Sequence, residues 1–243
     1  MSQSLILGGT KGLGRELATQ SIQRGFDTIV VGRSAAGLAA DPEFKDADMR
    51  VADLSNPYAF GKIVEPADCY KHVFLVAGTF QTKPLMDTTP EESLALARIH
   101  LLGPVETLKS IHRMMLTQPP HSAPYHLVVI SSTSSYRIRE NEEMYCALQA
   151  AKAHFTRNWA PQILKDLPGS RVTLVLPAGI KTELYQGTGQ DTSDYMEPAV
   201  VAEVIWNFVL KQTEEFQELK IERNGSQPVI SIGSTAPHNP HFR

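Results

Sequence analysis

The chain has 243 residues, 42% of them hydrophobic and 20% charged, with a formal net charge of −3 at pH 7. This length suits one large domain, residues 1–243, and is too short for two well-separated domains. Without a basic cluster, the composition argues against nucleic acid or an acidic membrane surface as a partner.

Cysteine usage and the N-terminus indicate the compartment. Cys69 and Cys146 are far apart and fit no metal or redox spacing. The first apolar run follows no cationic leader and is interrupted by glycine after three residues. No apolar segment approaches the roughly 18 residues that a membrane span needs. We therefore expect a cytoplasmic protein without a membrane segment.

Strand-like runs alternate with helical patterns along the whole chain. The predicted strands are 5–7, 28–31, 49–52, 73–77, 126–131, 172–176 and 229–232, and the predicted helices are 13–24, 57–65, 90–117, 142–167 and 198–214. Apolar, β-branched strands separated by helices predict a single-domain α/β fold. We expect a doubly wound, Rossmann-like parallel sheet of about seven strands with helices on both faces. Segment 184–197, rich in Gly, Thr, Ser and Asp, is expected to form a substrate lid.

A glycine-rich loop follows the first predicted strand. Gly8 permits a sharp turn, Gly12 leaves room for a diphosphate against the backbone, and Gly14 lets the next helix pack closely on the sheet. The N–H groups and positive dipole end of that helix favour an anion. The spacing is G-x-x-x-G-x-G, and a structural turn is the alternative. Its position between a strand and a helix favours a dinucleotide site, to which the loop also contributes Thr10, Lys11 and Leu13.

The end of the second strand bears on the choice of dinucleotide. A carboxylate there would bind the ribose 2′-hydroxyl of NAD, but Arg33 presents a guanidinium that can bind a 2′-phosphate. Lys11 adds a second positive charge, so the sequence favours NADP(H) over NAD(H); a solvated surface arginine is the alternative. Asp53, after the third strand, is a candidate partner for the adenine amino group, with a helix N-cap as its alternative role.

Motifs along nearly the whole chain resemble those of the short-chain dehydrogenase/reductase family. Besides the glycine loop and Arg33 they are Asp53-Leu54, Ala77-Gly78, Ser131-Ser132, Tyr145 and Pro177-Ala178-Gly179-Ile180-Lys181-Thr182. The resemblance implies hydride transfer to or from a nicotinamide, with Tyr145 exchanging a proton with the substrate oxygen and Ser132 polarising it. A structural serine and tyrosine are the alternative.

Two positions depart from the family pattern. Gln149 replaces the lysine expected four residues after the tyrosine, and it can hydrogen-bond a ribose hydroxyl but carries no charge. His100 replaces the expected asparagine, and it either joins a proton relay or is satisfied by backbone groups. An unperturbed tyrosine has a pKa of about 10 and stays neutral near pH 7. The missing charge therefore disfavours dehydrogenation more than carbonyl reduction, which needs only a proton donor.

Lys152 is a candidate substitute for the missing lysine. It follows Tyr145 by seven positions, which places it on nearly the same helical face and about 10 Å further along the axis. Helical side chains lean toward the N-terminus, so a lysine covers part of that gap. The alternative is an ordinary helix lysine in solvent.

The resemblance also implies further contacts and partners. The main chain at Ile180 would meet the nicotinamide carboxamide, and the Thr182 hydroxyl would reach the amide or the diphosphate. The other implied cofactor-binding residues are Leu54, Ala77, Gly78 and Pro177. Helices 90–117 and 142–167 commonly form homodimer or homotetramer contacts in this family. His238 and His241 have no third ligand nearby, so no metal is expected.

The sequence thus predicts an NADP(H)-dependent short-chain oxidoreductase that reduces the carbonyl of a small or medium-sized metabolite. The loss of the family's lysine and asparagine beside an intact glycine loop supports an alternative, a catalytically weak or inactive NADP-binding sensor or scaffold. A third reading is an enzyme of altered chemistry in which His100 is the titrating group.

Overall fold

The computed structural model describes residues 3–38, 40–65, 69–117 and 123–233. Their strands form one eight-stranded sheet in the order β3-β2-β1-β4-β5-β6-β7-β8. The pairs from β3 through β7 are parallel, and β7 pairs with β8 antiparallel. The strands are β1 (Gln3–Leu7), β2 (Asp27–Gly32), β3 (Asp48–Val51), β4 (Tyr70–Leu75), β5 (His126–Ile130), β6 (Arg171–Pro177), β7 (Phe216–Asn224) and β8 (Gln227–Gly233).

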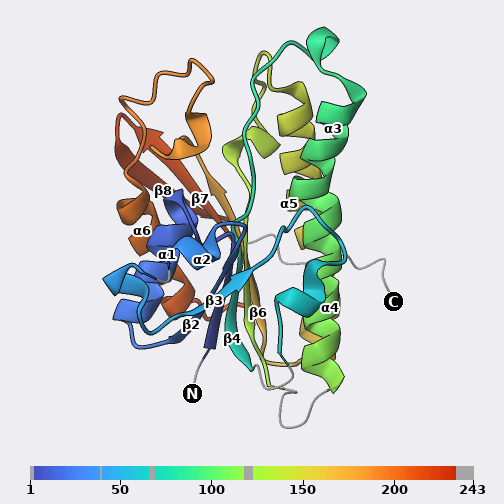
Figure 1. The fold of residues 1–243 in the computed structure, drawn as a ribbon, viewed down its shortest axis with the longest axis vertical. Coiled ribbons are helices and arrows are strands. Elements are labelled where there is room, and N and C mark those ends of the chain that lie inside the picture. Colours follow the sequence, from blue (N-terminus) through green and yellow to red (C-terminus); the bar gives the residue numbers. More distant parts are fainter. Residues whose placement is uncertain (1–2, 39, 66–68, 118–122, 234–243) are drawn as a thin grey trace.

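Helices cover both faces of this sheet (Figure 1). On one side lie α1 and α6, and on the other lie α4 and α5, with α3 continuing the line of α4. The helices are α1 (Gly12–Gln23), α2 (Ala35–Leu38), α3 (Pro90–Ala97), α4 (Gly103–Thr117), α5 (Glu143–Asp166) and α6 (Pro198–Lys211). Among the described residues, none of these helices combines the length and apolarity that crossing a bilayer needs.

The core has two halves, one on each face of the sheet. Leu5 and Leu7 of β1 pack into the half that contains Ile111 and Ala153, whereas Ile6 points to the other half. This alternation is the period-2 pattern of a strand covered on both sides. The predicted single-domain, doubly wound α/β fold is therefore confirmed.

The sheet has eight strands where the sequence predicted about seven. The missed strand is β7, whose sequence mixes buried Leu219 and Ile221 with charged residues. Glu218 is also buried there, in an ion pair with Arg157. The predicted final strand, 229–232, lies in β8, which runs antiparallel to β7 after a turn at Gly225 with φ +56°. A charged residue that points inward to an ion pair hides the alternation on which the sequence prediction depends.

Two predicted helices also need correction. Segment 57–65 forms only a 3-10 turn, at 59–62. Segment 90–117 is interrupted by one π-helical turn, 98–102, which contains His100. Pro104 has no N–H to donate to the His100 carbonyl, so the regular i to i−4 ladder cannot continue there. Such turns often occur at functional sites.

Candidate active site

The glycine loop lies at the carboxyl ends of the central strands, where open α/β sheets bind ligands. Gly8 and Gly12 have φ of +95° and +51°, a region that residues with a Cβ rarely adopt. A Cβ on Gly8 would lie 2.6 Å from the backbone of Ala77, and one on Gly14 would lie 2.1 Å from the Gly8 carbonyl oxygen. The loop therefore needs glycine to bring its backbone, helix α1 and β4 together.

Helix α1 presents its amino end to this loop. Its N-cap residue, Lys11, has an extended backbone and provides no side-chain cap, and the first turn contains no acidic residue. The amide groups of that turn are therefore available to an anion, and Leu13 behind them is buried in the core. Thr10 packs closely on Gly32 of β2, because a Cβ there would lie 2.6 Å from the threonine methyl. This contact ties the loop to the neighbouring strand.

The segment after β6 folds over the same loop. Pro177 is the last residue of β6, and Ile180 forms an isolated bridge to Met196. The Thr182 side chain lies above Gly12, where a Cβ would approach its methyl carbon within 2.9 Å. Its hydroxyl accepts a hydrogen bond from the Leu184 N–H at 3.4 Å. A diphosphate in this cradle would therefore lie between the α1 amides and Thr182.

A cavity of about 240 Å³ lies beside the ends of β2 and β3. Arg33 and Asp53 both line it, and the guanidinium is close enough to contribute to the lowered pKa of the Asp53 carboxyl, after the Ser55 amide as main cause. Asp53 Oδ1 accepts hydrogen bonds from the Ser55 N–H at 2.9 Å and hydroxyl at 2.8 Å. The sequence reading missed three polar residues of this wall, Asn56, Tyr58 and Lys62. A correct prediction of segment 57–65 was needed to place Tyr58 and Lys62 at this wall.

Three other predicted cofactor residues lie between the glycine loop and α4. The Leu54 side chain is buried in the core, and the Leu54 carbonyl contacts the helix at Gly103. The Ala77 N–H donates to the Leu7 carbonyl at 2.9 Å. Gly78 is exposed, and a Cβ there would lie 3.0 Å from the His100 ring. Leu54 thus presents only main chain, whereas the absence of a side chain at Gly78 lets the backbone pack directly on the buried His100 ring.

Ser132 and Tyr145 lie together at the end of β5. Burial raises the pKa of the Tyr145 phenol to about 12, against the lowering effect of hydrogen bonds from Ser132 and Gln149. Ser132 Oγ also accepts from the Ser134 N–H at 3.1 Å. The buried phenol is neutral at physiological pH, so it is a proton donor rather than a base.

His100 and Gln149 form a directional chain beside this pair. The Ser131 hydroxyl donates to Gln149 Oε1 at 3.1 Å and to the Gln149 carbonyl at 2.9 Å. Gln149 Nε2 lies 3.4 Å from His100 Nδ1, and His100 Nε2 lies 2.8 Å from the Thr79 carbonyl oxygen. These partners fit a neutral imidazole that donates from Nε2 and accepts at Nδ1. Burial, with Lys152 as a second cause, lowers the pKa of His100 to about 3. The ring therefore stays neutral, which counts against the reading of His100 as a group that titrates near neutrality.

Lys152 is buried, so it is not the ordinary solvent-exposed helix lysine that was the alternative to a catalytic role. Only 3% of the residue is exposed, and Nζ donates to the Ile130 carbonyl at 3.3 Å. Burial lowers the pKa of this amine to about 8. Among the described residues no ion pair to Lys152 is found, a buried cation without such a partner is costly, and residues with such strong shifts cluster at functional sites.

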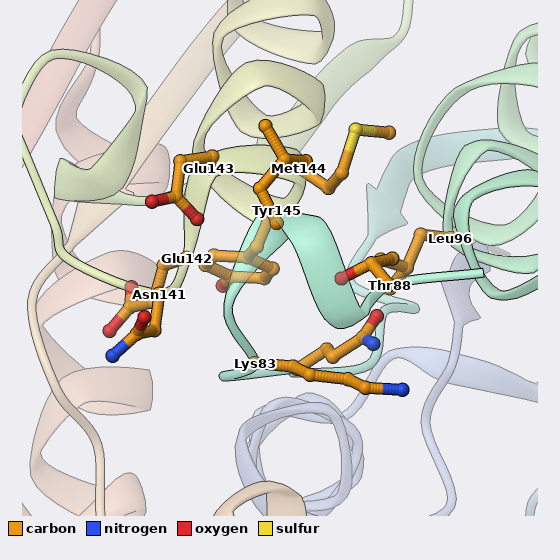
Figure 2. A pocket seen from close by; sticks show the side chains of 10 residues that line it. Lys83, Thr88, Leu96, Asn141, Glu142, Glu143, Met144 and Tyr145 are labelled. Atoms are coloured by element: carbon orange, nitrogen blue, oxygen red, sulfur yellow. The ribbon is translucent and has the colours of Figure 1, made fainter. Parts of the chain in front are cut away.

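Predicted lid segment 184–197 lies close to the phenol. Its ends are joined, because the Lys181 N–H donates to the Met196 carbonyl at 2.8 Å and the Met196 N–H to the Gly179 carbonyl at 3.1 Å. Tyr185 packs on Phe80 at 4.9 Å between ring centroids, and Phe80 packs on Tyr145 at 5.0 Å. On the side of Tyr145 shown in Figure 2, a cavity of only about 10 Å³ remains.

No group of three or more potential ligands for a metal is found among the described residues. His238 and His241 lie outside those residues. Both cysteines are free thiols.

Comparison with known proteins identifies the family of this chain. The model of the family described as short chain dehydrogenase matches residues 3–193. Carbonyl reductase family member 4 from Danio rerio is 25% identical over 216 residues, which cover 83% of this chain and 88% of the relative.

Two solved structures show the same fold. The 3-ketoacyl-(acyl-carrier-protein) reductase from Brucella melitensis, complexed with NADH, superposes with a TM-score of 0.80 at 18% identity, covering 93% of this chain and 98% of the other. An alcohol dehydrogenase from Thermococcus sibiricus, complexed with 5-hydroxy-NADP, superposes with a TM-score of 0.77 at 20% identity, covering 94% and 99%.

Proposed function

This chain belongs to the short-chain dehydrogenase/reductase family and is an oxidoreductase that uses a nicotinamide dinucleotide, and from that premise we propose that it reduces a carbonyl group with NADPH. The observation that carries this proposal is Ser132 beside the neutral, buried phenol of Tyr145, at the sheet edge that also bears the glycine loop.

The preference for NADP(H) is supported by charge at the adenine end. Arg33 follows β2 with its side chain exposed at the 240 Å³ cavity, and Lys62 lines the same wall. Two cations there suit a 2′-phosphate, since a guanidinium binds phosphate oxygens in pairs. Asp53 and Asn56 offer hydrogen-bond partners to a base. The glycine loop and Thr182 are the residues that would hold the diphosphate.

The cofactor supplies the hydride, and the chain's residues handle the proton. Ser132 orients the substrate oxygen, and Tyr145 donates its proton to that oxygen as the carbonyl is reduced. Gln149 holds the phenol on one side and His100 on the other, so it is a positioning residue that also suits a ribose hydroxyl. Lys152 lies close enough to influence His100 electrostatically, and we propose that its positive charge favours the phenolate that remains after proton transfer.

Self-association and location are further parts of the proposal. Leu94, Leu102 and Leu116 are each more than 40% exposed along the line of α3 and α4, which supports a homodimer or homotetramer through this surface. Two free thiols without a disulfide between them support a cytoplasmic location.

Consumption of NADPH with a panel of aldehydes, ketones and quinones tests the proposal. We expect turnover of at least one carbonyl class, and tighter binding of NADPH than of NADH in titration calorimetry. Binding of NADPH without turnover of any compound would favour the alternative, a sensor or scaffold. That alternative is supported by the loss of the family's lysine at Gln149.

The variant Gln149→Lys distinguishes a weakly active enzyme from a sensor or scaffold. A large gain in NADPH oxidation would mean that Tyr145 is aligned but weakly activated, whereas silence in both proteins would favour the scaffold. Because Lys152 already occupies the interior near this position, the variant is best assayed above pH 8, where the buried amine loses its charge.

A further inference from the structure

A row of aromatic rings extends from the Tyr145 phenol. Phe80, from the loop after β4, meets Tyr145 edge-on with centroids 5.0 Å apart. Tyr185 packs on Phe80 at 4.9 Å, and Tyr195 meets Tyr185 at 5.0 Å. These rings come from separate segments, so the row is not a local sequence pattern. Any molecule that brings a carbonyl to Tyr145 must lie against π faces or displace them.

A mostly buried glutamate stands beside the same phenol. Glu142 precedes α5, and only 9% of it is exposed. Burial raises its pKa, and its charge in turn raises the pKa of Tyr145. Among the described residues, no hydrogen bond or ion pair to the Glu142 carboxylate is found. The Glu142 oxygens are not among the fully buried, unpartnered side-chain oxygens of the described residues, so the carboxylate keeps access to solvent and a ligand cation can reach it.

The nearby cations do not fill that role. Arg139 favours the charged form of Glu142 electrostatically but lies beyond ion-pair distance. Lys83 lines the same small cavity as Glu142 (Figure 2), but its Nζ is held by both carboxylate oxygens of Glu92, at 2.9 and 2.8 Å. The carboxylate next to the aromatic row is thus open to an external cation.

We propose that the preferred substrate is an aryl carbonyl compound that carries a protonated amine, with its ring against Phe80 and Tyr185 and its ammonium group on Glu142. This inference rests on the proposed carbonyl reduction. Aromatic rings attract cations through their faces, and the attraction increases when water is excluded. Glu142 and Tyr145 are three residues apart, about 5 Å along a helix axis, which a single substituted ring can span. The same carboxylate repels anionic carbonyl compounds.

A matched pair of ketones tests this. 4-(Aminomethyl)acetophenone and 4-ethylacetophenone differ mainly in charge, and their binding to the full-length protein with saturating NADPH is measured by titration calorimetry. We expect the cationic ketone to bind about tenfold more tightly, the gain of one desolvated charge pair with its ring contacts. We expect a similar ratio in kcat/KM.

Variants assign the effect to Glu142. Glu142→Gln should bring the ratio close to one, whereas Glu140→Gln, an exposed position nearby, should keep it. If Glu142→Gln fails to fold, Tyr185→Leu serves instead. This variant should weaken the binding of both ketones while leaving the preference for the cationic ketone intact.

The outcomes separate this inference from the proposed function. Equal reduction of both ketones would overturn the inference and leave carbonyl reduction standing. Tight binding of the cationic ketone without turnover would support the ligand class and count against the enzyme. A preference that persists in Glu142→Gln would overturn the assignment to this carboxylate, and failure to bind either ketone would overturn the site.

Discussion

The two ends of the proposed binding edge depend on different features of the sequence. The proposed adenine end is open, with a cavity of about 240 Å³ and exposed Arg33. The proposed catalytic end is more enclosed, with a cavity of about 10 Å³ on one side of Tyr145, and it buries His100 and Lys152. Backbone amides and glycines bind a diphosphate whatever surrounds them, but proton transfer depends on pKa values that burial sets. The catalytic end can therefore change its chemistry without disturbing the cofactor end.

The largest expected effect is at Tyr145. Tyr145→Phe removes the proton donor and should lower kcat about 1,000-fold, within the range of a lost general acid. Because the ring and its contact with Phe80 remain, NADPH affinity should change less than about twofold. Steady-state kinetics and calorimetry measure both. Tyr136→Phe, at a half-exposed position, is the control. A loss of NADPH affinity as large as the loss in kcat would show that the two ends are not independent.

At the cofactor end the matching test is Gly12→Val. The position has φ +51° and no room for a Cβ below Thr182, so the loop must distort. We expect the NADPH dissociation constant to rise at least about 100-fold, since several charge-assisted contacts are lost together. Gly37→Val, with open space around the glycine, is the control. Calorimetry with retained far-UV circular dichroism provides the measurement, and unchanged affinity would contradict the proposed diphosphate site.

The residues of the proposed cofactor end follow from local sequence patterns, whereas the surroundings of Lys152 do not, for a physical reason. A glycine loop between a strand and a helix is a local pattern, and so is Arg33 at a strand end. The environment of Lys152 depends on Ile130 and His100, which are distant along the chain. Helical periodicity alone left the burial of Lys152 open. The cost of burying its amine appears only when the sheet and the π-helical turn 98–102 are in place.

The errors in the fold have the same origin. β7 was missed because Glu218 faces inward to Arg157, a pairing that no local pattern reveals. Residues 57–65 have the composition of a helix, yet only a 3-10 turn forms there. This loss hid Tyr58 and Lys62 at the cofactor cavity. Long-range partners therefore decide the parts that periodicity misassigns.

A smaller effect is expected for cofactor choice. Arg33→Gln should weaken NADPH binding about 30-fold, the size of a lost charged hydrogen-bond pair, and leave NADH binding nearly unchanged. Lys62→Gln should weaken NADPH binding about threefold, because a single exposed cation contributes less binding energy. Arg113→Gln on the far helix α4 is a control that should change neither. Equal losses for both dinucleotides would indicate that Arg33 does not contact a 2′-phosphate.

The effect expected at Lys152 is smaller than that at Arg33, and there function and stability should oppose each other. At a separation of about 10 Å, the axial rise of seven helical residues, a unit charge contributes about 1.7 kcal/mol at an effective dielectric constant of about 20, so Lys152→Met should lower kcat about tenfold below pH 8. Wild-type kcat should fall as pH rises through about 8, where the native-state amine deprotonates, and this inflection should be absent in the variant. Lys165→Met, exposed on the same helix, should keep it.

The free energy of unfolding of Lys152→Met gives an independent test, because its expected change has a definite direction. The unfolded amine binds its proton up to about pH 10.5 but the native amine only to about 8, so the unfolded state binds more protons between these values. Wild-type stability should therefore rise with pH through this window, whereas below pH 8 it carries a constant penalty of at most about 3 kcal/mol. Urea unfolding at pH 7 should show Lys152→Met to be more stable, with a gap that narrows at pH 10. A variant that is less stable at pH 7 would mean that the buried amine holds the fold together rather than serving the catalytic end.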